Sequence, residues 1–208
     1  MSRPYALAIS ILFHPVFMPI IALFLIFTSD SYLSNNTSDE AKNILYLFVF
    51  ILTIVMPGLS TFILVRNKMV SHITLPLQKD RTAPYAITIF YYILLYYLLR
   101  KIPNIPGPML SVVLGSIAML LIILVINPRF QISAHMAGIA GLCGIYIGLS
   151  TSDIILGDLF ITCLLIIAAG FVGTARLSLG AHRPSEIYSG ALLGFLCEYL
   201  VIRYHLFL

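Results

Sequence analysis

Seven long apolar runs alternate with short polar connections along the 208 residues of the chain. A helix needs roughly 20 apolar residues to cross the ~30 Å hydrocarbon layer of a bilayer, and most of these runs have about that length. The pattern predicts an all-α polytopic bundle of seven transmembrane helices, or six if the short, Tyr-rich third run does not cross fully. We treat the chain as a single integral membrane domain. The runs cover about residues 5–28, 44–66, 84–100, 108–127, 134–150, 154–175 and 186–206.

The composition agrees with a membrane protein, since 60% of the residues are hydrophobic and 10% are charged, against roughly a quarter charged in soluble domains. No A-x-A-like cleavage site precedes Ser29, so we expect the first run to be a retained helix. The formal net charge of +4 is scattered, so we expect the lipid bilayer and no nucleic acid as a partner. A compact chain without a retrieval signal favours a bacterial cytoplasmic membrane. The sequence does not set an oligomeric state.

Three connections hold most of the polar residues, and they read NKMVSHITLPLQKDRTAP (67–84), NPRFQISAH (127–135) and ARLSLGAHRPSE (175–186). With seven crossings these three share one side of the membrane, because an even number of helices separates each from the next. Basic residues are more numerous on that side, which favours a cytoplasmic location. They are Arg3, Arg66, Lys68, Lys79, Arg81, Arg129, Arg176 and Arg183, against Lys42, Arg100, Lys101 and Arg203. Without Lys79, Arg81, Arg176 and Arg183, which could bind an anion, the two sides are equal, so the count does not decide the orientation.

Together the three connections could build an anion site with a nucleophile. A guanidinium presents a planar fork that can chelate two phosphoryl oxygens, and it stays charged where water is scarce. A phosphoryl group is therefore the natural ligand. The first connection supplies Lys79 and Arg81, the second Ser133 and His135, and the third Arg176, His182 and Glu186.

The spacing within these connections suggests roles. His182 and Glu186 are four residues apart, so on a helical turn the carboxylate would hold Nδ1–H of the imidazole and leave Nε2 free to attack. Ser133 and His135 stand where the fifth apolar run begins, and the first N–H groups of a helix bind anions. His135 could donate a proton to a departing alkoxide.

The third connection resembles the third motif, S-R-x5-H-x3-D, of the type 2 phosphatidic acid phosphatase (PAP2) superfamily. I-S-A-H at 132–135 looks like a variant of the second motif, P-S-G-H, and S-G-A-L-L-G at 189–194 looks like the glycine-rich helix that follows the third. The first motif, K-x6-R-P, matches least, since Thr82 follows Arg81 and Thr74 stands where its Lys would be. The resemblance covers about residues 66–200 as a PAP2-like core. It leaves the N-terminal helix and polar loop, residues 1–43, outside.

This resemblance implies a metal-independent phosphatase of membrane lipids that needs no cofactor, with His182 as the residue that becomes phosphorylated. Glu186 would orient His182, and His135 would protonate the leaving group. The phosphoryl oxygens would be held by Arg176, Arg81, Lys79 and Ser133. Polyprenyl phosphate or diphosphate, phosphatidate and phosphatidylglycerol phosphate all fit as substrates. The chain departs from the motifs at Ile132, Ala134, Ala175 and Glu186, where the family has Pro, Gly, Ser and Asp.

The sequence also allows two other functions. The imperfect first motif and Glu186 favour a non-catalytic relative that binds or moves a phospholipid. Asp158 and Glu198, which lie in apolar runs, would suit a proton-coupled transporter. Alternatively, both residues have a structural role, with Asp158 at the membrane interface and Glu198 paired with Arg203. We expect a structural role for His14, His72 and His205.

Overall fold

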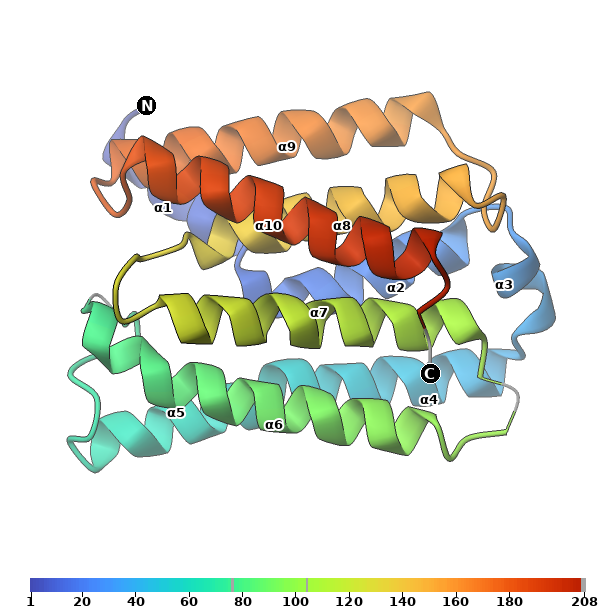
Figure 1. Ribbon diagram of the computed structural model, residues 1–208, viewed down its shortest axis with the longest axis horizontal. Helices are drawn as coiled ribbons and strands as arrows, with labels where there is room; N and C mark the ends of the chain where they lie inside the picture. Colours follow the sequence, from blue (N-terminus) through green and yellow to red (C-terminus); the bar gives the residue numbers. More distant parts are fainter. Residues whose placement is uncertain (76, 104, 207–208) are drawn as a thin grey trace.

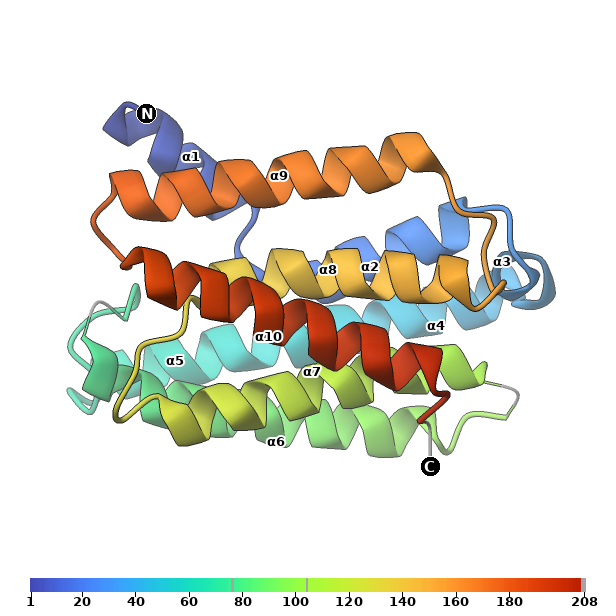
Figure 2. The same ribbon diagram turned by 45° about the horizontal axis from the view of Figure 1, so that its top comes forward.

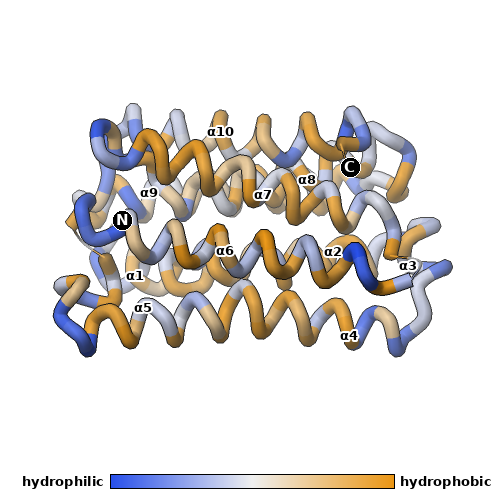
Figure 3. Tube along the Cα trace, turned by 60° about the horizontal axis from the view of Figure 1, so that its bottom comes forward, coloured by the Kyte–Doolittle hydropathy of each residue, from blue (hydrophilic) through white to orange (hydrophobic). Residues whose placement is uncertain are grey.

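The structure is a computed structural model that describes residues 1–75, 77–103 and 105–206, and these residues form helices and no strand. Within these described ranges, seven helical stretches are long and apolar enough to cross a membrane, which confirms the predicted all-α class and the count of seven. They lie side by side as a bundle (Figure 1), with hydrophobic positions along the helices and hydrophilic positions at the two ends (Figure 3). The chain is therefore an integral membrane protein. The stretches are Arg3–Thr28, Asp39–Arg66, Gln78–Leu99, Gly107–Ile126, Ala134–Thr151, Leu159–Ser178 and Pro184–Arg203.

Three of the seven stretches are composite. The first joins α1 (Arg3–Leu12), the 3-10 turn η1 (Pro15–Phe17) and α2 (Met18–Thr28), the second joins α4 (Asp39–Val49), the π-helical η2 (Phe50–Val55) and α5 (Met56–Arg66), and the third joins η3 (Gln78–Arg81) and α6 (Thr82–Leu99). The others are α7 (Gly107–Ile126), α8 (Ala134–Thr151), α9 (Leu159–Ser178) and α10 (Pro184–Arg203), and a short helix, α3 (Tyr32–Asn36), follows the first stretch.

The first stretch breaks at His14 and Pro15. Proline lacks the N–H that a helix interior needs, and Nδ1 of His14 accepts a hydrogen bond from the backbone N–H of Val16 at 3.4 Å. Because of this break, α1, which precedes it, does not continue the line of α2 and packs against α9 (Figure 2). The kink therefore brings the N-terminal helix beside the end of α9 that carries Arg176.

Capping residues move two helix boundaries away from the predicted ones. The polar segment 29–43 contains α3, and α4 begins at Asp39 because the Ser38 hydroxyl accepts from the N–H of Ala41 at 3.3 Å. In the sixth stretch, α9 begins at Leu159 because the Asp158 carboxylate accepts from the N–H of Phe160 at 2.7 Å. Asp158 is thus an exposed helix cap, which agrees with its interfacial interpretation.

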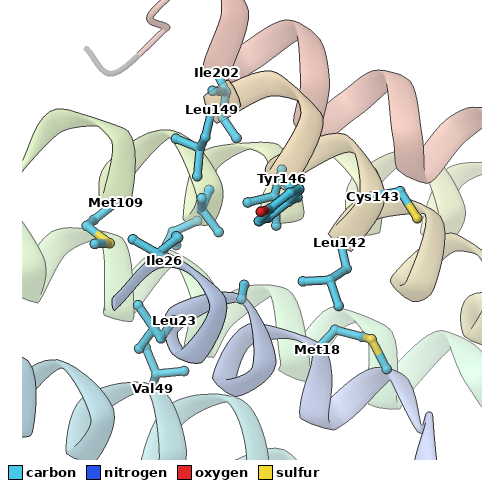
Figure 4. Close-up of a cluster of buried hydrophobic side chains, with 14 of the residues drawn as sticks. Met18, Leu23, Ile26, Val49, Met109, Leu142, Cys143, Tyr146, Leu149 and Ile202 are labelled. Carbon is cyan, nitrogen blue, oxygen red and sulfur yellow. The ribbon is translucent and has the colours of Figure 1, made fainter. Parts of the chain in front are cut away.

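The core lies around α8, the most buried of the seven stretches. Side chains of α8 such as Leu142, Tyr146 and Leu149 pack with Ile26 of α2 and Ile202 of α10 (Figure 4). Helices α8 and α10 pack especially closely, because a Cβ atom at Gly194 would collide with the backbone of Ala137. Small residues allow this kind of approach in membrane bundles. The close contact sets the second polar connection against the third.

The three polar connections lie at the same end of the bundle, as the seven crossings predict. Residues 67–75, 127–133 and 179–183 are on the left in Figure 1, and the C-terminus lies toward the other end. The chain therefore gathers its predicted site residues on one side of the membrane.

Candidate active site

His182 and Glu186 form a hydrogen-bonded pair at the start of α10. Nδ1 of His182 lies 2.9 Å from Oε2 of Glu186, and the same oxygen accepts from the backbone N–H of Arg183 at 3.1 Å. His182 itself precedes α10, whereas Glu186 is the third residue of the helix and reaches back over its N-terminus. The predicted contact is present, but the expected placement of both residues on one helical turn is wrong. Since a carboxylate accepts, Nδ1 carries the proton and Nε2 is left with its lone pair.

The surroundings of His182 favour its neutral form. The side chain is 1% exposed. Burial lowers the pKa of His182 below its ordinary value of 6.5, the bond to Glu186 opposes this effect in part, and the charges of Arg176 and Arg81 add to it. At pH 7 the imidazole is therefore neutral, as a nucleophile must be.

Arg81 is buried at the end of η3 and is held from two connections. Its Nε donates to the backbone oxygen of Leu75 at 3.0 Å. With the Gln131 amide turned so that its oxygen faces the guanidinium, Nη1 and Nη2 donate to that oxygen at 2.8 and 2.7 Å. A guanidinium has five N–H groups. Leu75 and Gln131 take three, and the Tyr85 side chain is also within hydrogen-bonding reach, so at least one is left for an anion. Lys79, in the same turn, has an exposed side chain.

A second polar contact fixes η3 against the end of α7. Nδ2 of Asn127 donates to the backbone oxygen of Gln78 at 3.0 Å, and Nε2 of Gln78 donates to the backbone oxygen of Asn127. Asn127 is 3% exposed, so the exchange is shielded from water. It holds the turn that carries Arg81.

Arg176 lies in the last turn of α9 and points toward α1. Its Nη1 donates to the hydroxyl oxygen of Ser10 at 3.3 Å. Its Nε is buried and has no hydrogen-bond partner among the described residues. An arginine with an unused buried donor is suited to bind an anion, because an unsatisfied buried N–H is costly.

His135 lies in the first turn of α8, and α1 holds it in place. Its Nε2 lies 3.2 Å from the backbone oxygen of Ser10, and its ring is 5.0 Å from the His14 ring in an edge-to-face arrangement. A carbonyl oxygen only accepts, so Nε2 carries a proton and Nδ1 is the open nitrogen. Arg176 and His182 are also close enough to His135 to interact with it electrostatically.

The backbone of Ser133 joins the second polar connection to the third. Its backbone N–H donates to the backbone oxygen of Glu186 at 3.1 Å. Its hydroxyl is buried and makes no hydrogen bond with any residue that the structure describes. The serine is thus placed beside the His182–Glu186 pair through its backbone.

The structure gathers six of the seven predicted site residues at one place and leaves Lys79 exposed. Sequence reasoning missed four others that hold the site together, namely Ser10, His14, Asn127 and Gln131. His14 was expected to be structural, and it does cap η1, yet its ring also contacts His135. The Pro residues beside His14 indicated a kink, but no local signal indicated where the kink would direct α1.

Comparison with known families covers the second and third polar connections. Residues 127–208 match the family model of the PAP2 superfamily. The matched part contains His135, Arg176, His182 and Glu186, whereas Arg81 lies before it. No curated protein and no solved structure matches the chain. The match indicates phosphatase-type activity on phosphate esters. The predicted resemblance to the PAP2 superfamily is thus confirmed over residues 127–208.

Proposed function

We propose that the protein is a lipid phosphate phosphatase that hydrolyses a phosphomonoester or diphosphate of a lipid through a phosphohistidine at His182. One observation carries the proposal. Nδ1 of His182 is bound to Glu186 at 2.9 Å, so the lone pair of Nε2 is free. The guanidinium groups of Arg81 and Arg176 are close enough for their charges to act on this ring.

In the first step, Nε2 of His182 attacks phosphorus and a P–N bond forms. The bond between phosphorus and the lipid oxygen breaks in line with the attack. That oxygen receives a proton from Nδ1 of His135, whose ring is protonated on both nitrogens when this step begins and keeps the Nε2 proton bound to Ser10. Arg81 and Arg176 bind the other phosphoryl oxygens, whose charge they stabilise. Glu186 stabilises the positive charge that the His182 ring acquires.

In the second step, water attacks the phosphorus of phosphohistidine and the P–N bond breaks. His135, now without the proton it donated, accepts one from the water. His182 returns to its neutral form, and inorganic phosphate leaves. No residue other than His182 forms a covalent bond to the substrate.

The membrane setting favours a lipid over a soluble phosphate ester. The site lies where three short connections meet at one end of the bundle, near the level of lipid headgroups. A lipid can bring its phosphate to this level while its tail stays among the helices. Polyprenyl phosphate or diphosphate, phosphatidate and phosphatidylglycerol phosphate all meet this condition. We place the protein in a bacterial cytoplasmic membrane.

The experiment is phosphate release from these lipid phosphates by purified protein in detergent, with a chelator present. We expect release by the wild type and none by His182→Ala. The matched control is His72→Ala, since His72 is an exposed histidine in a connection at the same end of the bundle. Absence of release from every lipid, with lipid phosphate still bound in an Arg176-dependent way, would favour the non-catalytic relative instead.

A further inference from the structure

A cavity of about 440 Å³ lies inside the bundle, next to the candidate active site. Its lining begins near the site at His14, Leu75 and Ala134 and consists mainly of apolar side chains. Leu75 and His14 contact Arg81 and His135, respectively, so the cavity adjoins the site through them. The volume is in the range of about 300–1,000 Å³ that is typical of small-molecule pockets.

The cavity also reaches the outer surface of the bundle. Phe17 of η1 and Gly58 of α5 both line it, and both are exposed. A Cβ atom at Gly58 would meet nothing within 4 Å, so the space beside it is open. A hydrocarbon chain could therefore enter from the bilayer between η1 and α5.

A carboxyl group lies deep in this apolar cavity. Glu198 of α10 is 1% exposed, and its Oε1 accepts from the Ser116 hydroxyl of α7 at 2.6 Å. Its Oε2 is buried and has no hydrogen-bond partner among the described residues. The expected pairing with Arg203 is wrong, because Arg203 is exposed at the end of α10 and Glu198 faces α7 instead.

The neighbouring helices leave room for this carboxyl group. A Cβ atom at Gly115 would collide with the Glu198 carboxyl, and one at Gly141 would lie 3.3 Å from Glu198 Cγ. Glycine at both positions lets the side chain lie between α7 and α8. Since a buried polar group without a partner is costly, the Glu198 carboxyl group is suited to one further hydrogen bond from a ligand.

The lining narrows the chemistry of that ligand. No Lys or Arg is among the described lining residues, and Glu198 is the one carboxyl group there. A divalent metal ion would need several more oxygen ligands with charge. A carboxyl group accepts hydrogen bonds in either protonation state, and the neutral acid also donates. A hydroxyl group both donates and accepts, so it suits Glu198 in both states.

The position of Glu198 sets where this hydroxyl must be. Glu198 follows Glu186 by twelve residues on α10, which is about 18 Å at 1.5 Å per residue. Ser116 lies ten residues before the end of α7, about 15 Å by the same rise. The polar pair is therefore near the bilayer midplane, at the depth of the far end of a lipid chain whose phosphate is at His182.

We propose that the cavity binds the hydrocarbon chain of the lipid phosphate, and that Glu198 and Ser116 bind a hydroxyl group carried toward the far end of that chain. This inference rests on the proposed function and names its substrate class: lipid phosphates with a hydroxylated chain. Glu198 is a specificity residue, remote from the reacting phosphorus.

The test measures equilibrium binding of labelled alkyl phosphates to His182→Ala protein, in which turnover does not consume the ligand. The probes are a saturated alkyl phosphate and a series of isomers in which one hydroxyl moves along the chain. We expect the isomer whose hydroxyl lies about 15–18 Å from phosphorus to bind about tenfold or more tightly than the plain chain, as one well-placed buried hydrogen bond allows. Adding Glu198→Leu should abolish this preference and leave the affinity for the plain chain unchanged. Adding Glu198→Gln, which keeps a donor and an acceptor, should retain it.

Thermal unfolding of each variant distinguishes a loss of hydroxyl binding from a loss of folding stability. Ser111→Ala serves as a matched control because Ser111 is buried on α7 outside the cavity lining. Equal affinity for plain and hydroxylated chains, or a preference that survives Glu198→Leu, would overturn the proposal. So would an equal loss of both affinities together with a lower Tm, which would make Glu198 structural. Phosphate release from the plain alkyl phosphate by protein with His182 intact is measured separately. Absence of that release would overturn the proposed function, while the hydroxyl preference tests the cavity.

Discussion

The backbone oxygen of Ser10 lies 3.2 Å from Nε2 of His135, although 125 residues separate them. The hydroxyl of the same serine accepts from Arg176 at 3.3 Å. One residue of the N-terminal helix thus contacts both the proposed proton donor and a proposed phosphate-binding arginine. The kink at His14 makes this possible, and the first transmembrane stretch becomes part of the site.

Ser10→Ala should lower kcat/KM by about two- to tenfold, because it removes one hydrogen bond of about 0.5–1.5 kcal/mol from Arg176 and leaves the backbone contact with His135 in place. Steady-state phosphate release measures the effect. Ser29→Ala is the matched control, since its hydroxyl donates to Leu25 near the far end of the same stretch. An equal loss in both variants would show that the serine acts through general stability.

Glu186→Asp should reduce kcat on the order of a hundredfold, as expected when a catalytic group is misplaced by ~1 Å. The shorter carboxylate would have to retract from either His182 or the N–H of Arg183, which now share Oε2. Single-turnover kinetics would locate the loss in the chemical step. Glu40→Asp, also in the first turn of a helix, should leave kcat unchanged. An unaltered rate in Glu186→Asp would contradict the orienting role of the carboxylate.

The pH dependence of kcat/KM should have an acidic limb below pH 6.5, since the lowered pKa keeps His182 neutral until the pH falls through that lowered value. Arg176→Gln should move the limb to higher pH, because loss of a nearby positive charge raises the pKa of His182. Glu186→Gln should move it to lower pH. All profiles are measured with the same substrate, so that ionisation of the substrate contributes equally to each of them. Shifts in the same direction for both variants would be inconsistent with this electrostatic account.

Gly194→Ala should destabilise the protein and lower activity, because the new methyl group would collide with the backbone of Ala137. Overpacking of this kind costs about 1–3 kcal/mol, and it would push the His182–Glu186 pair away from α8. Thermal unfolding in detergent together with phosphate release measures both effects. Gly170→Ala on α9, where a Cβ would meet nothing within 4 Å, should leave Tm and activity unchanged. Tolerance of alanine at position 194 would mean that the close packing of α8 and α10 is not required.

The features that sequence predicted well are local ones. The seven crossings follow from runs of apolar residues, and the His182–Glu186 contact follows from a spacing of four residues within one short connection. Helix ends were less accurate, since they depend on whether a side chain such as that of Ser38 or Asp158 caps the backbone.

The features that sequence missed depend on contacts between distant segments. The role of Ser10 depends on the direction that the kink at His14 gives to α1. The role of Gln131 depends on a guanidinium fifty residues earlier in the chain, which one sequence does not reveal. Glu198 was identified as unusual within its apolar run, but only the packing of α7 and α10 shows that it faces Ser116 inside a cavity.

The most direct test of the central claim is to trap the covalent intermediate. Protein would be mixed with a lipid phosphate that carries a labelled phosphoryl group, quenched in alkali within one turnover and digested to peptides. We predict label on the peptide that contains His182, and none in His182→Ala protein. Phosphate release without labelled protein, or label on a residue other than His182, would contradict the account.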